Sequence, residues 1–153
     1  MTGKLSLILI VLVLAACNNR SPLATSLIEL GDSGMVPGKE YLLELKRSER
    51  DTLSGKIGTL SFLVRYSETT RIYELPLILE YGSLESDSVK KMDLKIPLFE
   101  KNNLENRSHN SLIHEKLVPL FKDFILEEGF FMALKTFQEN SEGVMEIGLI
   151  FNN

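Results

Sequence analysis

The chain has 153 residues, of which 44% are hydrophobic and 25% are charged, and its formal net charge is -4 at pH 7. This length fits one domain with a sizeable core. Lysine and glutamate are interspersed without a basic block, which excludes a nucleic-acid surface built from clustered positive charge.

The N-terminus has the layout of a secretory signal peptide. Lys4 supplies a positive charge, residues 5–14 form an almost unbroken apolar run, and Ala15 and Ala16 follow as small residues. The apolar run is shorter than the roughly 20 residues that a transmembrane helix needs. We therefore expect residues 1–16 to be removed on export.

Cys17 follows this segment and is the only cysteine of the chain. The tetrapeptide Leu14-Ala15-Ala16-Cys17 resembles the lipobox of bacterial lipoproteins, in which the cysteine thiol receives a diacylglycerol. A lone thiol cannot close an intramolecular disulfide and is a liability in an oxidising compartment, and acylation removes that liability. We predict lipidation at Cys17, and the alternative is an ordinary signal peptide that happens to contain a cysteine.

The mature chain is predicted to contain a short tether followed by one β-domain. Residues 17–26 are expected to be the lipidated cysteine and its tether. Farther along, apolar residues recur with period two, which predicts strands with one face on a core. The clearest predicted strands cover residues 41–45, 60–65, 71–81, 92–98, 130–137 and 144–151. About seven or eight strands over residues 27–153 predict an all-β fold, an antiparallel β-sandwich of the jelly-roll or immunoglobulin-like kind.

Three of these segments carry more specific expectations. Pro76 has no amide hydrogen, so its strand is expected at a sheet edge or broken by a bulge. Residues 130–137 are apolar on both faces, which predicts a central strand. Residues 110–128 come close to helical spacing, but Pro119 argues against one uninterrupted helix. A short strand or irregular segment followed by a turn of helix is expected there.

The last strand is expected to pack one face on the core and to approach another strand closely. The residues predicted to share the core face are Met145, Ile147, Leu149 and Phe151. Gly148 lies between them and predicts a close approach of the backbone.

The sequence shows no catalytic or metal-binding pattern. His109 and His114 are five residues apart, a spacing that makes no ready metal pair, and a solvated or hydrogen-bonded role is expected for both. No Gly-x-Ser-x-Gly turn is present, and the strand carboxylates alternate with apolar residues as surface groups do. We therefore predict a protein that is not an enzyme and needs no cofactor or metal.

Two further sets of residues could serve binding or modification. An aromatic platform for a glycan or another small ligand would draw on Tyr41, Tyr66, Tyr73 and Tyr81, although strand aromatics more often pack in a core. The triplets Asp51-Thr52-Leu53 and Asp87-Ser88-Val89 resemble an O-glycosylation site of some gliding and gut bacteria, so Thr52 and Ser88 are candidate acceptors.

Several segments in order resemble the gliding-motility lipoprotein family GldH. These segments are Leu63-Val64-Arg65-Tyr66, Tyr73-Glu74-Leu75-Pro76-Leu77, Gly129-Phe130-Phe131 and Gly143-Val144-Met145-Glu146-Ile147-Gly148-Leu149-Ile150. The resemblance implies an accessory, non-enzymatic component of the envelope machinery of gliding bacteria. Its expected partners are the membrane, through the anchor on Cys17, and envelope or motility proteins, and its expected place is the periplasmic face of the outer membrane. The alternatives are a ligand-binding sandwich and an envelope hydrolase that uses dispersed carboxylates.

Overall fold

All regular secondary structure in the described part of the chain is β-strand. The computed structural model describes residues 22–47, 55–86, 88–99 and 113–153. The strands are β1 (Ala24–Glu29), β2 (Tyr41–Glu44), β3 (Lys46–Arg47), β4 (Ile57–Ser67), β5 (Glu74–Ser83), β6 (Lys90–Pro97), β7 (Ile113–Ile125), β8 (Phe130–Lys135) and β9 (Val144–Asn152). None of these residues forms a helix that could span a membrane.

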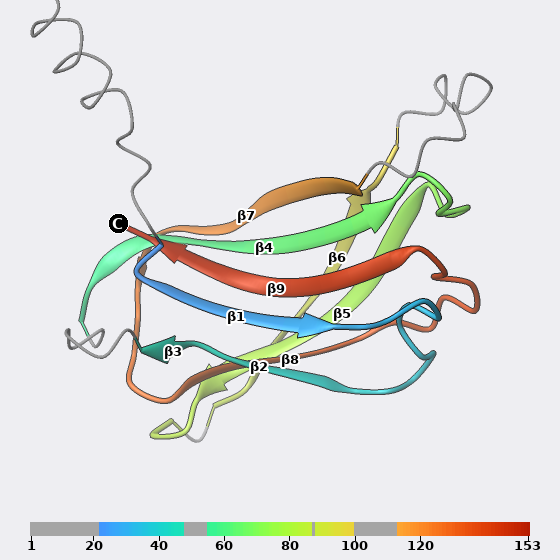
Figure 1. Cartoon of the computed structure of the whole chain (residues 1–153). Coiled ribbons are helices and arrows are strands. Elements are labelled where there is room, and N and C mark those ends of the chain that lie inside the picture. Colours follow the sequence, from blue (N-terminus) through green and yellow to red (C-terminus); the bar gives the residue numbers. More distant parts are fainter. Residues whose placement is uncertain (1–21, 48–54, 87, 100–112) are drawn as a thin grey trace, which may run out of the picture.

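The strands form two antiparallel sheets packed face to face (Figure 1). Sheet A has the order β3-β1-β9-β4-β7, and sheet B has the order β2-β8-β5-β6. Every neighbouring pair is antiparallel. The expected all-β antiparallel sandwich is therefore confirmed. The central strand expected at residues 130–137 is confirmed for residues 130–135, because β8 lies between β2 and β5, but Thr136 and Phe137 follow the strand.

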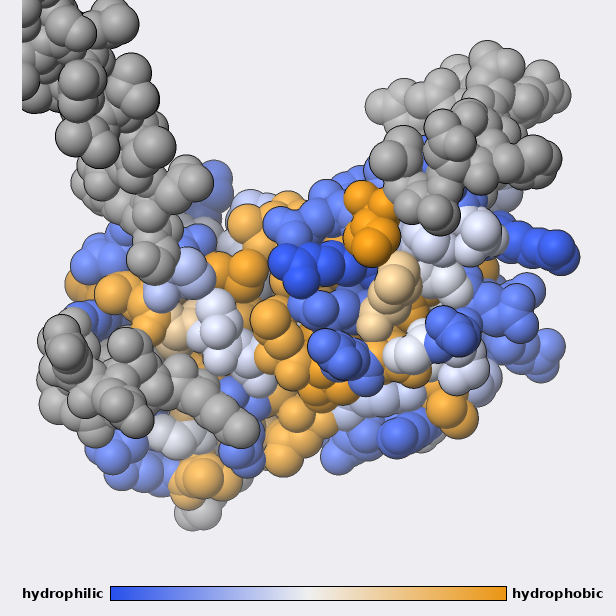
Figure 2. All heavy atoms as spheres, in the orientation of Figure 1, coloured by the Kyte–Doolittle hydropathy of each residue, from blue (hydrophilic) through white to orange (hydrophobic). Residues whose placement is uncertain are grey.

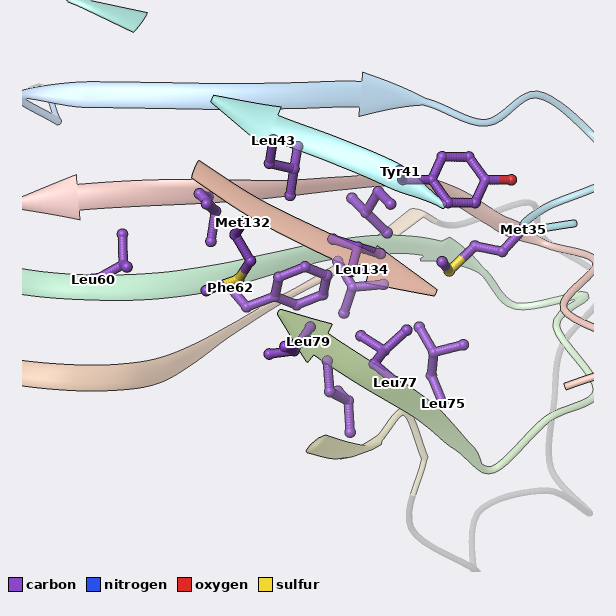
Figure 3. Packing of buried hydrophobic residues seen from close by; sticks show 14 of the residues in the cluster. Met35, Tyr41, Leu43, Leu60, Phe62, Leu75, Leu77, Leu79, Met132 and Leu134 are labelled. Carbon is purple, nitrogen blue, oxygen red and sulfur yellow. The ribbon is translucent and has the colours of Figure 1, made fainter. Parts of the chain in front are cut away.

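The core lies between the sheets and is built by the alternation seen in the sequence. Leu60, Phe62 and Val64 point inward from β4 and are fully buried. Figure 3 shows the ring of Phe62 among side chains of sheet B that include Leu79 and Met132. Burial of each such side chain contributes about 1.5–3 kcal/mol, which makes this two-sided core the main source of stability.

Residues 113–125 form one long edge strand, so the expected turn of helix is wrong. Pro119 is tolerated because β7 has a neighbour on one side only. The register with β4 shifts twice, since Gly58 lies opposite Phe124, Leu60 opposite Phe121 and Ser61 opposite Pro119. These bulges interrupt the period of two, and the apolar residues then mimic helical spacing.

β5 is an interior strand, which corrects the expectation of an edge strand or a bulge at Pro76. It pairs with β6 on one side and with β8 on the other, but β8 reaches only as far as Ile78. Beyond that point the Thr136 hydroxyl donates a hydrogen bond of 2.7 Å to the carbonyl of Pro76. A side chain thus replaces the missing strand where proline has no amide hydrogen to offer.

The core face of β9 differs from the expected one at a single residue. Ile147, Leu149 and Phe151 are buried as predicted, but Met145 is exposed. The register with β4 shifts where Arg65 faces Glu146 and Tyr66 faces Val144, which leaves Met145 as the extra residue of a bulge. Val144 takes the core position instead.

The β-structure begins before the end of the expected tether. β1 starts at Ala24, and the Leu23 amide already donates a hydrogen bond of 2.9 Å to the Phe151 carbonyl. Residues 24–26 therefore belong to sheet A. The small side chain of Ala24 fills a core position that the sequence pattern does not mark as apolar.

Candidate functional site

Of the predicted modification sites, only Ser88 lies among the described residues. It is exposed in the loop between β5 and β6, where its amide donates to the Ser86 hydroxyl and the two hydroxyl oxygens are 2.8 Å apart. Cys17 and Thr52 lie outside the described residues, as do the signal segment and His109. Lipidation and O-glycosylation stay predictions.

The four candidate tyrosines are distributed over both sheets. Tyr41 and Tyr66 are buried, and each hydroxyl is used within the domain. The Val36 amide donates to the Tyr41 hydroxyl at 2.8 Å, and the Tyr66 hydroxyl donates to the Leu98 carbonyl at 2.6 Å. Tyr73 directly precedes β5, and Tyr81 lies near the far end of that strand. This arrangement does not form an aromatic ligand platform.

His114 lies on β7 beside aromatic side chains. Its ring stacks on Tyr66 with centroids 5.4 Å apart, and its Nε2 atom is 3.4 Å from Glu68 Oε1. Across the described residues, no group of three or more His, Cys, Asp and Glu side chains could hold a metal ion. His114 therefore has a packing and polar-contact role in this structure.

An apolar row crosses the outer face of sheet A. Leu27, Gly148, Leu63 and Leu117 lie side by side on β1, β9, β4 and β7, and we name these four residues the leucine row. Leu27 and Leu117 are 49% and 45% exposed, whereas Leu63 is 1% exposed although it points away from the core. Figure 2 shows an apolar band across this face, bordered by hydrophilic surface. The row therefore places two half-exposed leucines, on β1 and β7, at either side of the buried Leu63 on the outer face of sheet A.

Gly148 makes the leucine row possible. A Cβ atom at this position would lie 2.4 Å from Leu27 Cδ2 and 2.6 Å from the carbonyl oxygen of Ser26. Only a glycine leaves this space for Leu27. The close approach that the sequence predicts at Gly148 is confirmed, and its partner is β1.

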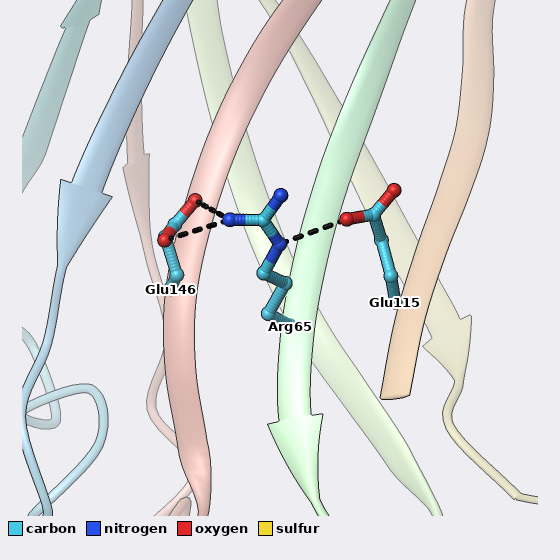
Figure 4. Close-up of polar contacts among 3 residues, drawn as sticks. All are labelled: Arg65, Glu115 and Glu146. Carbon is cyan, nitrogen blue, oxygen red and sulfur yellow. Dashed lines mark hydrogen bonds and ion pairs between the residues drawn. The ribbon is translucent and has the colours of Figure 1, made fainter. Parts of the chain in front are cut away.

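A charged row lies next to the leucine row. Each of its residues is two positions away, on the same strand, from a member of the leucine row. Glu29, Glu146, Arg65 and Glu115 are adjacent in register, and we name them the carboxylate row. Arg65 Nε donates to Glu115 Oε2 at 2.8 Å, and Nη1 lies 3.1 and 3.2 Å from the two oxygens of Glu146 (Figure 4). The hydrogen bond to Glu115, followed by the charge of Glu146, raises the pKa of Arg65 above its ordinary value.

The carboxylate row borders a hollow in the surface and carries a net negative charge. Three glutamates face one arginine, and Asp32 adds a further acidic group to a hollow of about 270 Å³ that Glu29, Arg65 and Glu146 also line. Arg65 holds Glu115 and Glu146 on an open sheet face, which suits recognition of a charged partner better than acid–base chemistry in a cleft. The exposed ion pair with Glu115 contributes only about 0.2–1 kcal/mol to stability, whereas the pair with Glu146 is partly buried.

One residue in the sequence already indicated this surface, but the predictions from the sequence did not use it. Leu63 occupies a position of β4 where strict alternation calls for a polar residue, between Ser61 and Arg65. Its neighbours come from β1, β7 and β9, so the row exists only once the register of four strands is known.

No family model matches the chain, and no curated protein matches its sequence. Among solved structures, the chain is similar to one described as the structure of Eiger TNF from S. frugiperda. The identity is 8%, the match covers 85% of this chain and 86% of that chain, and the TM-score is 0.35.

Proposed function

We propose that the protein is a lipid-anchored, non-enzymatic lipoprotein of the bacterial cell envelope that docks with another envelope protein through the outer face of sheet A. The observation that carries the docking role is the leucine row, an apolar strip with two half-exposed leucines on a surface that a self-contained sandwich would keep polar. The lipobox at Cys17 supports the anchor. The resemblance to GldH makes the gliding machinery of the outer membrane the expected setting.

The two rows define the chemistry of the partner. The leucine row fits an apolar groove, and the carboxylate row, with three acidic groups to one basic group, fits a basic rim beside that groove. Anchoring keeps both proteins in a thin layer at the membrane, so that a weak contact gains effective concentration. A surface that binds its partner only weakly in solution can therefore still form the complex at the membrane.

Detergent phase partition of the full chain tests the anchor. Protein made in cells is expected in the detergent phase, and Cys17→Ser is expected in the aqueous phase because two or more acyl chains give stable membrane binding. A radioactive fatty acid should label the wild-type protein but not Cys17→Ser. An unlabelled wild-type protein in the aqueous phase contradicts the anchor.

Crosslinking in intact cells, followed by affinity purification, tests the docking surface. The exposed half of Leu27 and of Leu117 should contribute about 1 kcal/mol each when a partner covers it. Leu27→Thr combined with Leu117→Thr should therefore weaken the complex about 30-fold. The matched control is Leu42→Thr, because Leu42 is equally exposed on the outer face of sheet B. Recovery of the wild-type chain alone, or equal loss in both variants, contradicts the proposed surface.

A further inference from the structure

Two exposed isoleucines lie opposite each other at one end of sheet A. Ile57 begins β4 and Ile125 ends β7, and the two are partners in the ladder. They are 55% and 57% exposed. Backbone hydrogen bonds hold this end closed, from the Gly55 amide to the Leu126 carbonyl at 2.8 Å and from the Leu126 amide to the Lys56 carbonyl at 2.9 Å. We name Ile57 and Ile125 the isoleucine tip.

The isoleucine tip lies at the end where the chain enters the domain. Ala24 faces Phe151, which in turn faces Leu60, and Ile57 lies three residues farther toward this end than Leu60. Figure 1 shows the start of β1, the start of β4 and the end of β7 at this same end. The tip therefore projects beyond the point at which β1 begins.

The short distance to the predicted anchor confines this end of the domain. Cys17 is six residues before Leu23, and six residues span at most about 20 Å when fully extended. A domain held by acyl chains on Cys17 thus keeps the start of β1 within that distance of the lipid surface, and the isoleucine tip lies at the same end of sheet A. Leu84, whose amide donates to the Gly129 carbonyl shortly after β7, is also exposed near this end, to 79%.

We propose that the isoleucine tip is a membrane-contact site that enters the boundary between lipid headgroups and acyl chains. This inference rests on the proposed lipid anchor. Exposed aliphatic side chains can enter the interface once an anchor holds them there, and the charge around the tip is mixed, with Lys56 and Lys122 as basic groups and Asp123, Glu127 and Glu128 as acidic groups. The anchor supplies the affinity, and the tip fixes the orientation of the sandwich.

The absence of tryptophan from the chain allows a direct test with single-tryptophan reporters. Ile125→Trp places the reporter at the tip. Ile113→Trp is the matched control, since Ile113 is 61% exposed at the other end of the same strand, roughly 40 Å away. The full lipidated chain is reconstituted in phosphatidylethanolamine–phosphatidylglycerol vesicles, with and without a lipid that carries a shallow nitroxide quencher.

The expected result is at least threefold stronger quenching of the Ile125→Trp reporter than of the Ile113→Trp reporter. Ile57→Trp, on the opposite strand, should behave like Ile125→Trp and provides a second reporter if one variant fails to fold. Equal quenching of tip and control reporters in protein that floats with the vesicles overturns the membrane contact while the anchor stands. If the tip reporter leaves the aqueous environment only after a protein extract is added, the membrane contact is overturned in favour of a protein partner. Protein that does not float at all shows instead that the anchor has failed, and the inference falls with it.

Discussion

Gly148→Ala tests the packing on which the leucine row depends. The new Cβ atom would lie 2.6 Å from the carbonyl oxygen of Ser26, whereas real Cβ contacts stay beyond 3.0 Å, so β1 must move by about 0.4 Å. It would also lie 2.4 Å from Leu27 Cδ2, but that atom can rotate away. Because Ser26 and Leu27 are paired with Leu149 and Gly148, the movement disturbs the ladder between β1 and β9.

We expect Gly148→Ala to lower the free energy of unfolding by about 2 kcal/mol, within the range of overpacking substitutions. For a domain of this size, the melting temperature should fall by roughly 5–10 °C. Circular dichroism of the purified full chain in detergent during heating measures this change.

Two further variants separate the backbone clash from other effects. Adding Leu27→Ala removes the side-chain contact but not the backbone one, so it should not restore stability. Gly82→Ala is a control in another strand, where the nearest atom is the Ser88 carbonyl oxygen at 3.0 Å in an exposed loop that can yield. Wild-type melting of Gly148→Ala, or full rescue by Leu27→Ala, would refute the proposed packing.

Thr136→Val should lower the free energy of unfolding by about 1–3 kcal/mol in urea titrations, because it leaves the carbonyl of Pro76 without its hydroxyl donor at a buried position; an unchanged midpoint would contradict this. Arg65→Met should lower the free energy of unfolding by about 1 kcal/mol, since its ion pair with Glu115 is exposed and its pair with Glu146 is partly buried, and a loss above about 3 kcal/mol would show that the carboxylate row is structural. If Thr52 and Ser88 carry glycans, Thr52→Ala and Ser88→Ala should each lower the intact mass by one glycan, and an unmodified wild-type mass would end that prediction.

The strands that follow strict alternation could be predicted from the sequence, and those that depart from it could not. Leu60, Phe62 and Val64 alternate with residues of the outer face, and the structure places them in the core. In β7 two bulges and Pro119 break the period, so a 13-residue strand resembles a partial helix. β1 escaped prediction because its first core residue is only an alanine, Ala24, in a polar stretch.

The candidate docking surface depends on register, which a single sequence does not reveal. Arg65 lies 50 residues from Glu115 and 81 from Glu146, and only the pairing of β4 with β7 and β9 brings the three together. Gly148 was predicted as a point of close approach, but nothing in its own strand identifies Leu27 as the side chain that fills the space. A residue of unexpected polarity on a strand is visible in the sequence, whereas its neighbours across the sheet are not.

The order of features along β4 gives the proposed orientation a second physical basis. Ile57 comes first, Leu63 follows roughly 20 Å farther along and Arg65 comes next, so the carboxylate row lies at the end away from the predicted anchor. A bacterial membrane that contains anionic lipid repels negative charge, and the repulsion falls off within about a Debye length of 8 Å. In the proposed orientation the carboxylate row lies outside that range, whereas Asp123, Glu127 and Glu128 near the tip lie within it, so the anchor and the isoleucines must outweigh their repulsion. The leucine row would then face sideways, parallel to the membrane, where a second membrane-bound protein can reach it.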